Sequence, residues 1–358
     1  MDKVTAIGIT CPPLSEIFFF DRWQHPSSTK LKEEIRLALI TLRQALDAAR
    51  DGGYGVGAFN VTDLAQAEAV LDAAAETDSP VIVQTIAGAS AHGKDEFFWE
   101  ALINGIKRYP QVPVVLHLDH GASYEDCVRA IDAGFTSVMI DGSLTDDRVT
   151  HATFEQNVAV TKKVTEYAHA RGVSVEGELG TIGGSEDGSE IKEIVLADPE
   201  EAAAFVEQTN VDALAVAIGT SHGAYKFTSP PDGSVLHMDL ITEIASRVPD
   251  THLVMHGSSS LPADLREVIN AHGGKLPESW GVPEEEKARS TKMGIRKINQ
   301  GMDSHMAFAA AVRSYLDEDG INVDPALYEG RGRVAMQKII AERMHVFGQA
   351  GQAYRHNG

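Results

Sequence analysis

The sequence predicts an α/β protein with a (β/α)8 TIM-barrel fold, and three observations support this fold class. Eight short apolar runs have the composition of buried strands. Amphipathic stretches lie between them, with apolar residues recurring at spacings of three and four. The chain has 358 residues, enough for one barrel with extra terminal helices. Eight alternations of strand and helix favour a closed barrel over an open sheet.

The elements follow in order along the chain. The expected strands are residues 56–60, 80–84, 113–118, 137–141, 174–179, 213–218, 252–255 and 295–299. The expected helices are residues 32–50, 64–76, 97–107, 124–133, 154–170, 199–208, 240–247, 262–271 and, after the last strand, 334–346. The first helix should end at Gly52-Gly53, because glycine commonly terminates helices.

Two kinds of segment fall outside this pattern. Residues 1–35 show no clear period, so we expect an N-terminal extension there and a barrel domain over residues 36–358. Two connections are longer than a barrel needs. Residues 180–193 are glycine-rich and acidic and directly follow a strand, which favours a mobile active-site loop over a plain solvated connection. Residues 273–291 are rich in Pro, Gly and charge and are expected to form a second long loop.

Charge and cysteine content exclude several classes of protein. The formal net charge of −21 argues against a nucleic-acid or anionic-membrane partner, although a small anionic substrate remains compatible with it. Cys11 and Cys127 are the only cysteines, too few for a disulfide framework or a cysteine zinc module. The apolar runs are far shorter than the roughly 20 residues of a membrane span, and the N-terminus lacks a secretory pattern. We therefore expect a cytoplasmic protein.

Polar residues at the ends of the expected strands are the candidates for chemistry. Asp119 and His120 follow the third strand, His222 follows the sixth and His256 the seventh. Strand ends meet at one mouth of a barrel, so three histidines there predict a zinc site with a free fourth position. A lone histidine beside a strand is more often a surface or core residue. The shared strand-end position, and the glycines that follow His222 and His256, favour metal binding.

Two glycine-containing turns late in the chain have the composition of anion-binding loops. They are residues 219–223 and 257–260, which follow the sixth and seventh strands. Barrel loops in these positions often offer backbone N–H groups and hydroxyls to a phosphate. Ordinary turn chemistry explains the same composition equally well.

The chain also resembles a known family. The segments that carry the resemblance are Leu116-His117-Leu118-Asp119-His120-Gly121, Glu176-Gly177-Glu178-Leu179-Gly180, the run 219–226 and His256-Gly257-Ser258-Ser259. Together they are similar to the successive signatures of the class II, zinc-dependent fructose-bisphosphate aldolases. The resemblance runs from about Leu39 to Ala353.

This resemblance implies roles for individual residues. Its implied zinc ligands are His120, His222 and His256, with Glu178 as an outer or alternative ligand, while Co2+ or Fe2+ would accept similar donors. Asp119 would be the acid/base at the cleaved bond, and Glu186 would handle the carbon-bound proton. Gly223, Gly257, Ser259 and Asn299 would bind the substrate and its phosphate, with a monovalent cation nearby. The family commonly forms homodimers or homotetramers.

Three residues depart from the family pattern at the substrate end. Gly301 and Met302 stand where the family usually has Asp and Thr, and Ile86 replaces a serine. The resemblance thus implies aldol cleavage of fructose 1,6-bisphosphate, and the three departures leave a different ketose phosphate or a less phosphorylated sugar as the alternative substrate. A non-catalytic metal-binding barrel is disfavoured because Asp119 and Glu186 are both present.

Overall fold

The computed structural model describes residues 38–145, 150–180, 195–223, 227, 229–318, 320–321 and 323–353, and the backbone of 184–186 and 189–191. Eight parallel strands close into a barrel in the order β1-β10-β9-β8-β5-β4-β3-β2. They are β1 (Val56–Asn60), β2 (Val81–Ile86), β3 (Val114–Gly121), β4 (Ser137–Ile140), β5 (Ser174–Leu179), β8 (Ala213–Val216), β9 (His252–Met255) and β10 (Ile295–Gln300). The predicted TIM barrel is confirmed.

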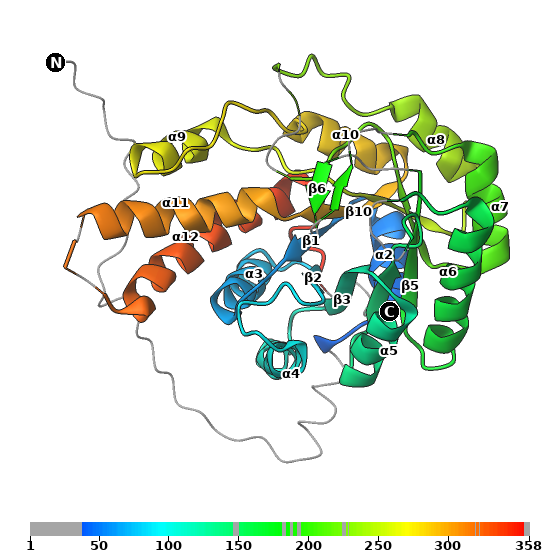
Figure 1. Ribbon diagram of the computed structural model, residues 1–358, viewed down its shortest axis with the longest axis horizontal. Helices are drawn as coiled ribbons and strands as arrows, with labels where there is room; N and C mark the ends of the chain where they lie inside the picture. The colour runs from blue at the N-terminus through cyan, green and yellow to red at the C-terminus, as the bar shows by residue number, and fades with distance from the viewer. Residues whose placement is uncertain are drawn as a thin grey trace.

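Helices surround the strands (Figure 1). They are α2 (Leu42–Gly52), α3 (Leu64–Glu76), α4 (Asp95–Ile106), α5 (Tyr124–Ala133), α6 (Phe154–His169), α7 (Pro199–Thr209), α8 (Met238–Arg247), α9 (Ala263–Ala271), α10 (Glu284–Met293), α11 (Met302–Glu318) and α12 (Pro325–Val346). Helices α11 and α12 lie alongside one another, and α12 also packs on α3.

Local capping explains where several helices begin. Thr41 and Gln44 form a reciprocal capping box, so helix α2 begins at Leu42. The expected helix from residue 32 was wrong for residues 39–41, whereas Ala38 is helical and residues 32–37 lie outside the described part. Asp324 accepts a hydrogen bond from Ala326 N, and Pro325 occupies the first turn, so the last helix begins nine residues before the expected 334.

The expected long loop over residues 273–291 was wrong in its second half. Helix α10 occupies Glu284–Met293 and follows Pro283, with three glutamates in its first turn. Acidic residues in the first turn are favoured by the helix dipole. The segment nevertheless lacks apolar residues at helical spacing, which was the pattern used to predict helices. Helix α11 was also missed, since its buried face consists largely of small or polar residues. Within residues 180–193, β6 (Gly184–Glu186) and β7 (Ser189–Ile191) pair antiparallel.

The barrel interior is apolar toward α2 and polar at its mouth, where the carboxyl ends of the strands lie. Inward-facing residues of the lower layers are small or aliphatic, and α2 packs against them: Val56, Ala58, Ile82, Val115, Met139, Ala213, Ala215 and Val254. A second, larger core lies between the strands and the outer helices. Because strand side chains alternate, the positions above the apolar layers also point inward at the carboxyl ends of the strands. These positions carry the polar residues of the site. Among the described helices, none is long and apolar enough to cross a bilayer.

Candidate functional site

Three buried histidines converge at the mouth of the barrel. His120 lies near the end of β3, while His222 and His256 lie in the connections after β8 and β9. One ring nitrogen from each lies within 4.8 Å of those of the other two. The backbone of His120 has a φ of 45°, a left-handed conformation that is uncommon outside glycine. The structure thus brings together the three histidines predicted from strand-end positions.

The contacts of His256 fix which of its nitrogens faces the cluster. Nε2 lies 2.8 Å from Oε1 of Glu176, and Nδ1 lies 3.1 Å from Nε2 of His120. Because a carboxylate can only accept, Nε2 of His256 carries the hydrogen and Nδ1 presents its lone pair to His120. An outer carboxylate that orients a histidine in this way is typical of metal-binding imidazoles. The donor set therefore fits a divalent metal that prefers nitrogen.

Glu176 belongs to a fully buried ionic group below the histidines. Nζ of Lys297 lies 2.8 Å from its Oε2, and Nε2 of His117 lies 3.6 Å from the same oxygen. Burial alone would raise the pKa of the Glu176 carboxyl, but Lys297 and His256 outweigh it and hold this pKa well below its usual range. Burial, reinforced by Lys297, lowers the pKa of His117 to about 3, so His117 is neutral.

Sequence reasoning did not assign a role to Lys297 or His117. The available signal was the alternation of strand residues. His117 lies two positions before Asp119, and Lys297 two before Asn299, so each pair points to the same side of its strand.

Asp119 is fully buried and accepts hydrogen bonds from three amide side chains. The donors are Asn60 Nδ2 at 2.8 Å, Gln84 Nε2 at 3.0 Å and Asn299 Nδ2 at 3.3 Å. Gln84 also donates to Oδ1 of Asn60 at 2.9 Å, which locks the two amides together. Such a cradle fixes the carboxylate in one orientation. Asn60 and Gln84 were missed because amides on short strands have no distinctive spacing.

Glu178 is connected to the histidines through a short polar chain. Its Oε1 lies 3.5 Å from Oγ of Ser143, which donates to Oδ1 of Asp141 at 2.6 Å. Oδ2 of Asp141 lies 3.6 Å from Nδ1 of His120. Glu178 is therefore linked to His120 through two intervening side chains. Glu186 lies on β6, and its side chain is outside the described part of the chain.

The two expected anion-binding turns lie against each other. Gly257 has a φ of 58°, and a Cβ on it would lie 2.5 Å from the carbonyl oxygen of Ser221. Any larger residue at position 257 would push the two turns apart. Gly223 is also left-handed, with a φ of 82°. Ser259 is buried.

The three departures from the family pattern lie around the same mouth. Ile86 is the strand neighbour of Asp119, so both side chains face the barrel mouth. A Cβ on Gly301 would lie 3.4 Å from Oδ1 of Asn60, an ordinary contact distance, and Met302 begins α11. Oδ1 of Asn299 and Oγ1 of Thr220 are buried without a partner among the described residues.

Both the sequence and the structure of the chain are similar to those of known aldolases. A sequence profile of class II fructose-bisphosphate aldolase matches residues 40–352. The fructose-bisphosphate aldolase of Pseudomonas aeruginosa is 49% identical over 329 residues, which are 88% of this chain and 93% of that protein. One from a Nostoc species is also 49% identical, covering 88% and 92%. The crystal structure of the YdjI aldolase from Escherichia coli K12 superposes with a TM-score of 0.69 at 27% identity, covering 88% of this chain and 99% of that one.

Proposed function

This chain belongs to the class II fructose-bisphosphate aldolase family, and from that premise we propose that it cleaves fructose 1,6-bisphosphate reversibly. The products would be dihydroxyacetone phosphate and glyceraldehyde 3-phosphate. The observation that carries the proposal is the cluster of His120, His222 and His256 at a barrel mouth that also holds the amide-bound carboxylate of Asp119. A metal site and an acid/base group are the two components that aldol cleavage of this kind requires.

We propose zinc as the metal, held by His120, His222 and His256. Three nitrogen donors match the ligand number of catalytic zinc sites, and Co2+ or Fe2+ would accept the same donors. Glu178 would serve as an outer or alternative ligand, since Ser143 and Asp141 connect it to His120. When bound, the metal supplies a Lewis acid that polarises the ketose carbonyl.

The proton chemistry falls to two carboxylates in this proposal. Asp119 would take the proton from the hydroxyl at the carbon that becomes the aldehyde, as the adjacent carbon–carbon bond breaks. In the condensation direction it would return this proton. Its three amide donors hold the carboxylate in place for this transfer. Glu186, from the loop after β5, would handle the proton on the carbon of the dihydroxyacetone phosphate half.

Substrate binding would use the two facing turns and β10. Gly223, Gly257 and Ser259 would hold the phosphate through backbone N–H groups and a hydroxyl. Asn299 would contact a substrate hydroxyl, because its Oδ1 is buried without a partner among the described residues. We expect the enzyme to be a homodimer or homotetramer.

A second candidate keeps the chemistry and changes the substrate. Gly301, Met302 and Ile86 remove polar groups from the mouth where the family pattern has them, and each unmet polar group on a substrate weakens binding by about 1–3 kcal/mol. A different ketose phosphate, or a sugar with fewer phosphates, would lose less binding affinity from the absence of these polar groups.

A coupled assay of the zinc-loaded protein, before and after EDTA, tests the proposal. We expect chelator-sensitive cleavage of fructose 1,6-bisphosphate that zinc restores. Absence of cleavage with zinc demonstrably bound would reject this substrate, and a panel of other ketose phosphates would then identify the true one. Cleavage that persists after complete zinc removal would reject the metal-dependent mechanism.

A further inference from the structure

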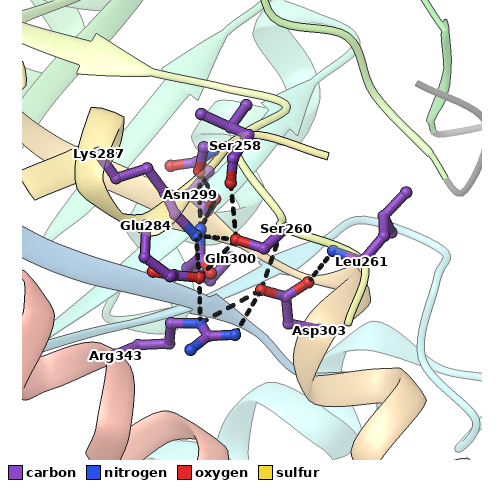
Figure 2. Close-up of polar contacts among 10 residues, drawn as sticks. Ser258, Ser260, Leu261, Glu284, Lys287, Asn299, Gln300, Asp303 and Arg343 are labelled. Carbon is purple, nitrogen blue, oxygen red and sulfur yellow. Dashed lines mark hydrogen bonds and ion pairs between the residues drawn. The ribbon is translucent and has the colours of Figure 1, made fainter. Parts of the chain in front are cut away.

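Behind the loop of residues 257–261 lies a group of four charged side chains that the proposed chemistry does not use. Glu284 and Lys287 come from α10, Asp303 from α11 and Arg343 from α12. Figure 2 shows the four side chains gathered around Ser260. Lys287 and Asp303 are fully buried, and Arg343 is nearly so. Three helices therefore meet the loop through four charges, of which only Glu284 is partly exposed to water.

The four charges compensate one another. Nζ of Lys287 lies 2.9 Å from Oε1 of Glu284, and Nε of Arg343 lies 3.1 Å from the same oxygen. Nε of Arg343 also lies 3.3 Å from Oδ2 of Asp303. Two cations and two anions leave the group neutral overall, as expected for buried ions. Its effect on a nearby anion should therefore come mainly from geometry rather than from net charge.

Ser260 and Leu261 are tied directly to this group. Nζ of Lys287 donates to Oγ of Ser260 at 2.7 Å. The carboxylate of Asp303 accepts from the backbone N–H of Ser260 at 3.1 Å and from that of Leu261 at 2.9 Å. Leu261 has a φ of 54°, an unfavourable conformation for a side chain of this kind, so it must be held by its surroundings.

The remaining neighbours of Ser259 are also fixed. Oγ of Ser258 donates to the carbonyl oxygen of Asn299 and accepts from Nε2 of Gln300, the latter at 2.8 Å. The carbonyl oxygen of Ser259 accepts from the backbone N–H of Val282 at 3.1 Å. The side chains on both sides of Ser259 thus have fixed partners within the protein.

From this arrangement we propose that Lys287 is a positioning residue for the loop of residues 257–261, which would bind the phosphate. Lys287 acts through Ser260, together with Glu284 and Asp303. By fixing Ser260 on one side of Ser259, the ionic group presents the Ser259 hydroxyl and the adjacent backbone N–H groups to a phosphate. Preorganisation of this kind raises affinity by removing the cost of ordering the loop upon binding. The inference rests on the proposed role of Ser259 as a phosphate contact.

Two variants of the zinc-loaded, full-length protein test the proposal. Lys287→Met removes the cation, and Ser260→Ala removes only the hydroxyl through which the cation acts. Lys292→Met is the matched control, because this exposed lysine lies on the same helix and donates to the backbone of Gly53. The probe is inorganic phosphate, measured by calorimetry and as a competitive inhibitor. Zinc content, kcat and KM are measured alongside.

We expect Lys287→Met and Ser260→Ala each to weaken phosphate binding and raise KM by about tenfold, with kcat and zinc content near those of the parent. Lys292→Met should match the parent. Parental phosphate affinity in both variants would overturn the proposal. Weakening in Lys287→Met but not in Ser260→Ala would also overturn it, because it would show that charge rather than position matters. If Lys287→Met does not fold, Ser260→Ala alone decides.

Calorimetry with phosphate separates this inference from the proposed function. A parent that binds phosphate but does not cleave fructose 1,6-bisphosphate would refute the proposed substrate, and the comparison of variants would still test Lys287. A parent that binds no phosphate would overturn the inference itself.

Discussion

The carboxylate of Glu176 accepts a hydrogen bond from His256, with 2.8 Å between Oε1 and Nε2, and this contact turns the other imidazole nitrogen toward His120. Glu176 is in turn held by Lys297 at 2.8 Å, in a fully buried setting. The orientation of one metal-site histidine therefore depends on a lysine from β10, a strand that is separated from β5 by two others in the barrel. An apolar interior would leave this ring free to rotate.

Glu176→Gln should weaken zinc binding by about 10–100-fold, because an amide is a poorer acceptor for the imidazole N–H than a carboxylate. Competition with a chelator of known zinc affinity measures this. Glu243→Gln, which changes a half-exposed carboxylate on α8, is the control and should bind zinc as the parent does. Circular dichroism must show that Glu176→Gln is folded, since Lys297 loses its partner. Unchanged zinc affinity in a folded variant would show that Glu176 does not orient His256 for metal binding.

Asp119→Ala should leave zinc bound while lowering kcat by about 10²–10⁴-fold, the usual contribution of a positioned acid/base. Asn60, Gln84 and Asn299 would lose their shared acceptor, but none of them is a proposed metal ligand. Turnover and zinc stoichiometry are measured on the same preparation. Asp51→Ala, at an exposed carboxylate on α2, is the control. Parental turnover in Asp119→Ala would mean that another group moves the proton.

Met302→Thr should lower KM for fructose 1,6-bisphosphate by about 10–150-fold if a missing hydroxyl limits phosphate binding, since one hydrogen bond to a charged group contributes about 1.5–3 kcal/mol. Residue 302 begins α11, directly after the β10 residues at the mouth. Steady-state kinetics of parent and variant with this substrate provide the measurement. An unchanged KM would show that the thioether has not cost affinity, and that the natural substrate does not need a donor there.

The polar residues at the strand ends could be predicted from sequence because they stand next to long apolar runs. His120, His222 and His256 interrupt or follow such runs, and the barrel fold then forces them together. Lys287 could not be found in this way. It lies on a helix whose charged sequence resembles a loop, and its role depends on packing against α11, α12 and Ser260. Long-range contacts of this kind leave no local period.

The charged residues inside the barrel could be predicted only in part from the sequence. Lys297 alternates correctly with Asn299 on β10, yet an inward lysine was not anticipated because it needs a buried partner. That partner, Glu176, comes from a strand far away in the chain. Once the register of the barrel is known, both residues fall on the inner face, and the pair follows.

His252 should make the protein less stable in mild acid. It begins β9 at the closed end of the barrel, where its Nε2 lies 2.9 Å from Oδ1 of Asp47 on α2. Burial lowers the pKa of His252 to about 4, although Asp47 opposes this. Between about pH 6.5 and pH 4 the unfolded chain binds a proton that the folded chain does not, so stability is present above this window and is lost as the pH falls through it.

His252 alone should make the free energy of unfolding about 2 kcal/mol lower at pH 5 than at pH 8. His252→Gln can still donate to Asp47 but does not titrate, so it isolates the effect from that of the other histidines. Urea unfolding of parent and variant at both pH values gives the comparison. The parent should lose about 2 kcal/mol more than His252→Gln on going from pH 8 to pH 5. Equal losses in the two proteins would show that His252 is charged in the folded state.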